Sequence, residues 1–259
     1  MHPSAEAVVL APALALGLVL AGRGGRVSGA RALAGGLAVA LVAAAFATEL
    51  EPLANRTFLW AHLLQNVLLA EWAPALLLLA LPGALAVRAE RFPLFRPLVA
   101  LPLWLGTYYA WHLPWLYDLA LRHPHSLLHL EHLTYLAAGI CLWWPVIHGS
   151  RSAGAKAAYL FAAFVLASPL GLLLALIPRA IYSFYAHAPR TWGPAPLADQ
   201  QIAGVTMAAE EAVVFFGAFA LYLLRFLQEE QAAGQLTPAA GSASGASPAR
   251  RPRSARQAG

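Results

Sequence analysis

Histidine is the residue with the clearest capacity for chemistry in this chain, and its spacing is most informative between His125 and His132. The segment carries His125, His129, Glu131 and His132 directly before a long apolar run. An α-helix turns ~100° per residue, so His129 and His132 share one face while Glu131 points away from that pair. Neutral imidazole is the commonest metal ligand, and two imidazoles on one face could hold a metal ion. The order differs from the H-E-x-x-H of a zinc protease, whose histidines are spaced by four.

A second group of polar side chains lies on the neighbouring apolar segments. His62, Gln65 and Asn66 fall on one face of a predicted helix, and His112 lies at the end of another. The connection from His112 to His129 is short and contains prolines, so we expect the two helices that it joins to be antiparallel neighbours. These histidines should therefore meet at one end of a helical bundle.

The last apolar helix contributes a carboxylate to the same end. Asp199 lies at its outer end and begins a stripe that continues through Ala203, Thr206 and Glu210. We expect four helix ends to converge on one pocket, roughly 5–10 Å below the outer interface. Asp199 would serve as a ligand or as a carboxylate that orients an imidazole. The predicted metal-site residues are His62, His112, His129, His132 and Asp199.

The composition indicates that these helices lie in a membrane. Hydrophobic residues make up 60% of the chain, charged residues make up 11%, and the mean hydropathy is +0.62. A soluble domain carries about 25% charged residues. Seven apolar stretches reach or approach the ~20 residues that span a bilayer, if the short stretch Pro97–Trp111 extends to Trp115. The other six are Val8–Gly22, Ala32–Thr48, Thr57–Leu81, Leu127–Ile147, Ala155–Ile177 and Ile202–Phe226.

We therefore predict an all-α polytopic membrane protein, a seven-transmembrane-helix bundle over residues 1–230. Residues 231–259 are rich in Ala, Gly, Ser, Pro and Arg, which cannot bury a core, and should form a disordered basic tail. Of the 17 Lys and Arg residues, four lie on one side of this topology and the remaining 13 on the other. Positive charge in short loops marks the cytoplasmic side. The N-terminus should be outside, the C-terminus and its tail cytoplasmic, and eight of the nine histidines extracytoplasmic, with His148 the exception.

The types of ligand limit the metal. Imidazole suits copper, zinc or iron, whereas thiolate and thioether suit Cu(I) best. Cys141 is the single cysteine, so a site built on a pair of cysteines is excluded. A histidine-rich and sulfur-poor site favours copper or zinc held by imidazoles, or haem iron with two axial histidines. The spacing alone does not choose among them.

Four ordered motifs resemble those of the seven-helix CtaG family, over about Arg56 to Phe226. They are H-L-L-Q-N followed by A-P-A-L-L-L-L-A-L-P, then W-H-L-P-W-L-Y-D-L-A-L, then H-L-E-H-L-T-Y-L-A-A-G-I-C-L-W-W-P-V, and finally P-L-A-D-Q-Q-I-A-G-V-T-M. The resemblance implies site roles for His62, His112, His129, His132, Asp199 and Gln200. The family usually has a histidine where this chain has Asn66, and a methionine where it has Leu63.

The resemblance also implies a function. CtaG-family proteins are bacterial membrane proteins implicated in cytochrome c oxidase assembly, with a proposed role in copper supply. We therefore expect a multi-pass protein of the bacterial inner or plasma membrane that binds or delivers copper on the extracytoplasmic side. Its partners would be haem–copper oxidase subunits and the lipid bilayer, with no nucleic acid, and it would not be an enzyme in the ordinary sense.

Two other classes of protein remain open from the sequence. One is an electron-transfer membrane protein with a haem held by two histidines between helices. The other is a transporter of small solutes or metals, in which Glu71, Glu210 and Glu211 would be carboxylates at the membrane midplane.

Overall fold

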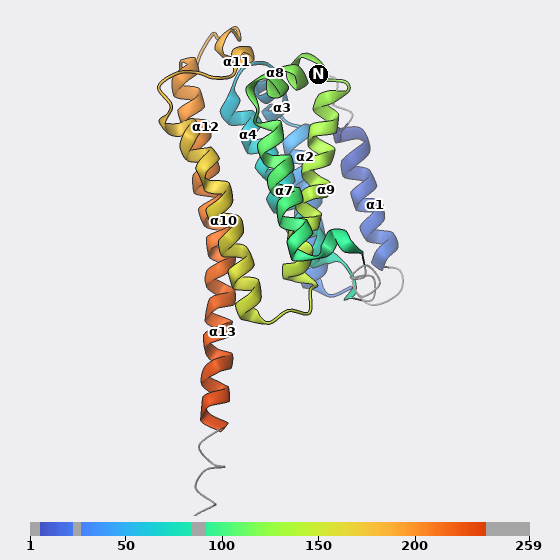
Figure 1. Ribbon diagram of the computed structural model, residues 1–259. Coiled ribbons are helices and arrows are strands. Elements are labelled where there is room, and N and C mark those ends of the chain that lie inside the picture. Colours follow the sequence, from blue (N-terminus) through green and yellow to red (C-terminus); the bar gives the residue numbers. More distant parts are fainter. Residues whose placement is uncertain (1–5, 23–26, 84–91, 237–259) are drawn as a thin grey trace, which may run out of the picture.

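The computed structural model describes residues 6–22, 27–83 and 92–236, and in these ranges it contains helices and no strand (Figure 1). This confirms the predicted all-α class. In chain order the elements are η1 (Glu6–Leu10), α1 (Ala11–Gly22), α2 (Gly29–Phe46), α3 (Leu50–Arg56), α4 (Leu59–Val67), η2 (Leu68–Trp72), α5 (Ala73–Ala80), η3 (Pro93–Phe95), α7 (Pro97–Trp111), α8 (Pro114–Arg122), α9 (Leu127–Ile147), α10 (Ala153–Leu176), α11 (Ser183–Ala186), α12 (Pro196–Glu211), η4 (Ala212–Phe216) and α13 (Gly217–Leu236).

Five helical runs in the described part of the chain are long and apolar enough to cross a membrane. They are Gly29–Phe46, Leu59–Ala80, Leu127–Ile147, Ala153–Leu176 and Pro196–Gln235. The other two predicted spans also form helices, but Glu6–Gly22 is a shorter apolar helix and α7 has 15 residues. A helical membrane bundle is therefore supported, while the count of seven spans and the orientation of the termini stay predictions.

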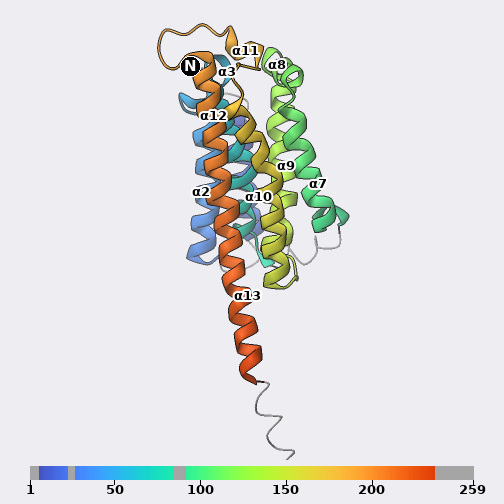
Figure 2. The same ribbon diagram turned by 60° about the vertical axis from the view of Figure 1, so that its left-hand side comes forward.

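The C-terminal helix is longer than the sequence predicted. α12, η4 and α13 form one rod that extends well past the other helices (Figure 2). It runs to Leu236, so the segment from residue 231 to 236, predicted as disordered tail, is helical. The rest of the predicted tail lies outside the described residues, as do His2 and the arginines Arg23, Arg26, Arg88 and Arg91.

The connection between α7 and α9 also differs from the expectation. α7 and α9 do lie side by side (Figure 1), but a helix, α8, forms most of the segment between them. Pro114 occupies the first turn of α8, where its missing N–H costs nothing. Tyr117 of α8 is fully buried. The connection thus adds an aromatic side chain to the bundle end.

Small residues allow the spans to approach one another closely. A Cβ on Gly139 of α9 would lie 2.2 Å from the carbonyl oxygen of Ala70 in η2. A Cβ on Gly204 of α12 would lie 2.4 Å from the backbone nitrogen of Ala175. Helices in lipid associate through such contacts because apolar side chains gain little by leaving one apolar medium for another. These two contacts bind α9 to η2 and α10 to α12.

The short helices α3, α8 and α11 lie together at one end of the bundle, which is the upper end in Figures 1 and 2. α9 begins at this end with Leu127, and α12 begins there with Pro196. α10 begins at the opposite end. The helix ends predicted to carry the histidines are therefore gathered at the upper end.

Candidate metal centre

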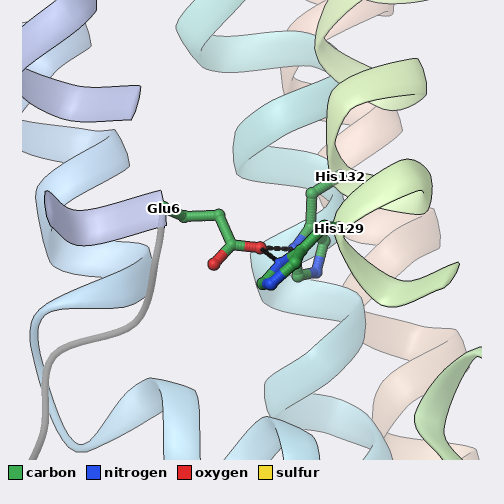
Figure 3. Close-up of side chains that lie close together, drawn as sticks. All are labelled: Glu6, His129 and His132. Atoms are coloured by element: carbon green, nitrogen blue, oxygen red, sulfur yellow. Dashed lines mark hydrogen bonds and ion pairs between the residues drawn. The ribbon is translucent and has the colours of Figure 1, made fainter. Parts of the chain in front are cut away.

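A carboxylate and two imidazoles meet at the upper end, between η1 and α9. Glu6, His129 and His132 each place one potential ligand atom within 4.8 Å of the others (Figure 3). The Nδ1 atoms of both histidines hydrogen-bond to Oε1 of Glu6, that of His132 at 3.0 Å. The side chain of His132 is 1% exposed and that of His129 is 30% exposed. The cluster thus reaches from the surface into the bundle.

His62 of α4 is the next imidazole inward, and its hydrogen bonds define its tautomer. Its Nδ1 lies 2.8 Å from the hydroxyl oxygen of Tyr185, which itself donates to the carbonyl of Ala54. Burial raises the pKa of the Tyr185 hydroxyl well above its usual range, so the hydroxyl keeps its proton. Since that proton goes to Ala54, Nδ1 of His62 must be the donor to Tyr185. The lone pair of a neutral His62 is therefore on Nε2.

The same assignment follows for the other histidines. Nδ1 of His112 donates to the carbonyl oxygen of Tyr108 at 2.8 Å, and Nδ1 of His132 donates to Glu6. In the described part of the chain, the buried Nε2 atoms of His62, His112 and His132 have no hydrogen-bond partner. An imidazole whose Nδ1–H is fixed by an acceptor and whose Nε2 is free has the arrangement of a metal ligand.

Glu131 is the carboxylate beside His62, and the sequence patterns predicted no role for it. It is fully buried, and its Oε1 lies 3.5 Å from Nε2 of His62. Asn66 donates to the same Oε1 at 2.9 Å. A carboxylate that faces an imidazole lone pair is repelled by it, so a cation bound between the two atoms would relieve this contact.

The three inner imidazoles, those of His62, His112 and His132, pack against aromatic rings. The ring centroids of His62 and His132 are 6.1 Å apart, and Tyr117 of α8 lies between the helices at 5.1 Å from His62 and 5.8 Å from His112. Tyr135 places its hydroxyl oxygen 3.2 Å from Nδ1 of His112. The imidazoles are thus held by ring packing as well as by hydrogen bonds, which fixes the direction of each Nε2.

Asp199 does not contact any of these imidazoles. Its Oδ2 accepts from the backbone N–H of Leu59 at 2.9 Å and from Arg190 at 2.8 Å, and its Oδ1 accepts from Trp60 N–H at 3.1 Å. These are the unpaired N–H groups of the first turn of α4, where a carboxylate is favoured. Asp199 therefore fixes the start of the helix that carries His62.

The loop that carries Arg190 depends on a glycine. Gly193 has a φ of +85°, and a Cβ there would lie 2.5 Å from the Phe58 ring. A side chain at this position would be strained for both reasons. Gln200, given a role only by the family resemblance, accepts from the N–H of Ile181 at 2.7 Å and donates to the carbonyl of Arg179 at 3.0 Å. It holds the segment between α10 and α11.

Of the other histidines that the structure describes, His125 contacts the site, with its ring centroid 6.3 Å from that of His129. His123, His125 and His187 are exposed, and Nδ1 of His123 and of His187 bonds to a carbonyl four residues earlier. His148, at the opposite end, donates through Nε2 to the carbonyl of Leu78 at 2.9 Å. The sequence missed Glu6 because no helical spacing connects it to α9. The helical spacing did not predict a role for Glu131, because this residue lies off the face that His129 and His132 share.

A helical bundle with five candidate membrane spans and a buried cluster of imidazoles and carboxylates at one end defines a polytopic membrane protein with a polar site at a helix-bundle end. The family model of the cytochrome c oxidase caa3 assembly factor (Caa3_CtaG) matches residues 13–229. The chain belongs to this family. No match was found among curated proteins or among solved structures. All the histidines of the site lie inside the matched segment, and Glu6 precedes it.

Proposed function

We propose that this assembly factor binds copper at the upper end of the bundle and delivers it to a haem–copper oxidase during assembly. The observation that carries the proposal is the cluster of Glu6, His129 and His132, beside which Nε2 of His132 is buried and has no partner in the described chain. Imidazole nitrogen and carboxylate oxygen suit Cu(II) and Zn(II). Copper is favoured because the family is defined by assembly of a cytochrome c oxidase.

The half-exposed position of His129 suggests how copper would reach the site. Copper would first meet His129 and Glu6 at the surface, and then His132, which contacts both Glu6 and the ring of His62. His62 and His112 would hold it deeper in the bundle. Because Glu6 accepts from both Nδ1 atoms, its ionised form would keep the Nε2 lone pairs available. The protein would thus act as a carrier and not as an enzyme.

The setting follows from the charge distribution. The protein would lie in the bacterial plasma membrane with its upper end outside, where it would meet the oxidase subunits, and with its basic tail near the cytoplasmic lipid surface. A reporter that is active only in the cytoplasm should work when fused after Ser152 and fail when fused after Asn55 or Pro189. The reverse pattern would place the site on the cytoplasmic side and contradict delivery from outside.

The metal itself is tested with the full-length protein purified in detergent. Copper and zinc bound per protein are measured by mass spectrometry after loading with each ion, for the wild type and for a variant with both His129→Ala and His132→Ala. We expect about one copper per wild-type protein and none in the variant. Equal retention by both proteins would contradict the proposal, and preference for zinc would exclude copper as the cargo.

The same sample tests the two alternative functions. A Soret absorption band would favour a haem held by two histidines over a copper site. Transport of copper into proteoliposomes, measured against empty vesicles, would favour a transporter over a carrier. Cells that lack the protein should assemble an oxidase with less copper, and normal copper content in that oxidase would contradict delivery.

A further inference from the structure

Three acidic side chains that play no part in the metal site meet where η2 packs beside α12. Glu71 lies in η2, and Glu210 and Glu211 are the last two residues of α12. Glu71 and Glu211 are fully buried. Both elements belong to candidate membrane spans, Leu59–Ala80 and Pro196–Gln235. Glu71 lies near the two glutamates of α12, because Trp72, the next residue, donates to Glu210.

Two of these carboxyl groups have a donor from a neighbouring side chain, and the third has none. Nε1 of Trp72 donates to Oε1 of Glu210 at 2.6 Å, and the hydroxyl of Tyr108 donates to Oε1 of Glu211 at 2.5 Å. Neither oxygen of Glu71 accepts a hydrogen bond from any donor in the described chain, nor does Oε2 of Glu210. Glu210 is nevertheless held beside η2, because Trp72, the residue after Glu71, donates to it.

The groups that face Glu71 carry no compensating positive charge. The titratable ones are Glu210 and Glu211 from α12 and Tyr108 from α7. α9 approaches η2 through Gly139, and the buried residues of α2, which also contacts η2, are all apolar. No Lys, Arg or His of the described chain interacts with Glu71. Two ionised carboxylates this close, out of water, would repel each other strongly.

We propose that Glu71 and Glu210 form a proton-binding site where η2 meets α12, in which one carboxyl group is a neutral acid that donates its hydrogen bond to the other, ionised carboxylate. The site takes up one proton and releases it without any redox change. Protonation supplies the donor that Glu71 otherwise lacks and removes one of the two adjacent charges. The π-helical turns support a specialised site, because Glu71 lies within η2 and Glu211 directly precedes η4.

The ligand is a proton and not a metal ion. In contrast to Glu6, His129 and His132, the three glutamates do not bring one oxygen each within 4.8 Å of one another. The indole and phenol donors already stabilise the ionised forms of Glu210 and Glu211. A hard cation needs several converging oxygen ligands, whereas a proton needs only the two that face each other here.

Modification by an apolar carbodiimide tests the site, because this reagent reacts with protonated carboxyl groups in apolar surroundings. The full-length protein in detergent is treated, and the modified residues are mapped by mass spectrometry. We expect modification of Glu71 or Glu210 and at least tenfold less at Glu229, which is exposed on α13. In Glu71→Gln the amide N–H replaces the shared proton, so modification of Glu210 should be lost.

Infrared spectroscopy gives a readout that does not depend on the reagent. The wild type should show the carbonyl stretching band of a protonated carboxylic acid, which Glu71→Gln removes and Glu211→Gln keeps. Absence of the band from the wild type would overturn the proposal. Protection of Glu71 and Glu210 from the carbodiimide by calcium or manganese ions would also overturn it, because it would identify a cation site.

Discussion

The histidines of the candidate metal centre at the upper end and the glutamates between η2 and α12 are buried except for the partly exposed His129 and Glu210, but their polar atoms are satisfied in opposite ways. At the upper end each inner imidazole donates to an acceptor from another position: Tyr185 for His62, the carbonyl of Tyr108 for His112, and Glu6 for His132. At the glutamates, the carboxyl groups of Glu210 and Glu211 are the titratable neighbours of Glu71. The first arrangement orients imidazole rings, and the second brings together carboxyl groups that cannot all be charged.

This difference bears on what each region can bind. A neutral imidazole costs little to bury, and once Nδ1 is satisfied its Nε2 lone pair is directed at whatever lies beyond it. A buried carboxylate without a donor is expensive until a proton neutralises it. This contrast supports our two proposals, a metal ion at the upper end and a proton at the glutamates. The following variants test the histidine site at the upper end.

The largest effect is expected from His132→Ala. His132 contacts Glu6 through Nδ1 and the ring of His62 through its own ring, so it links the outer and inner parts of the site. Its removal should abolish stoichiometric copper binding while the fold is retained. The matched control is His125→Ala, which removes an exposed imidazole whose ring packs beside that of His129. It should change copper binding by less than about twofold, because exposed side chains usually contribute little.

Copper per protein is measured for both variants at equal expression and thermal stability. If His125→Ala loses the metal while His132→Ala keeps it, the site lies in the loop and the imidazoles of α9 are only interface anchors. That result would also remove the contrast between the two buried regions.

The shared face of His129 and His132 could be predicted because it depends only on the geometry of one helix. The partners of that face could not. Glu6 approaches α9 through the packing of η1, which no local spacing encodes. Glu131 lies off the helix face that His129 and His132 share. Its direction brings it to His62 and Asn66 on α4.

The role of Asp199 shows the same limit. The sequence places a carboxylate at the outer end of the last helix, and the structure places one there. Its contact with the N–H groups of Leu59 and Trp60 joins residues far apart in the chain, so spacing could not reveal it. The start of α8 does have a local sequence signal, because proline is common in the first turn of a helix and Pro114 lies there.

A smaller effect is expected from Asp199→Asn, which separates a ligand from a residue that positions α4. The amide keeps the size of the side chain but loses the charge that pairs with Arg190 and the N–H groups. We expect a loss of about 1–3 kcal/mol in the free energy of unfolding with one copper still bound. Thermal unfolding and copper per protein are measured together. Loss of copper without loss of stability would show that Asp199 is itself a ligand.

A gain of function is expected from Asn66→His, which adds an imidazole one turn from His62 and opposite Glu131. Copper retention during dialysis against a chelator should increase severalfold, because a further nitrogen ligand would face the inner site. Gln65→His is the matched control, since the Gln65 side chain donates to the carbonyl of Ala45 and not to Glu131. An equal gain in both variants, or none in Asn66→His, would mean that this face of α4 does not reach the metal.

The smallest effect is expected from His148→Gln, at the end of the bundle opposite the metal site. Burial lowers the pKa of His148, and Lys156 and Arg31 lower it further. A lowered pKa means that the folded state binds the proton less readily than the unfolded state, so the stability contributed by neutral His148 is present above the usual pKa of about 6.5 and lost as the pH falls below it. Glutamine can still donate to the carbonyl of Leu78 but does not titrate. Between neutral and mildly acidic pH, the wild type should therefore lose about 2 °C or less in Tm relative to His148→Gln, since the side chain is half-exposed and solvent screens its charge. Copper binding should be the same in both proteins. A copper deficit in His148→Gln would show that a histidine with only a structural contact contributes to the metal site, and the distinction drawn here between oriented and merely satisfied imidazoles would fail.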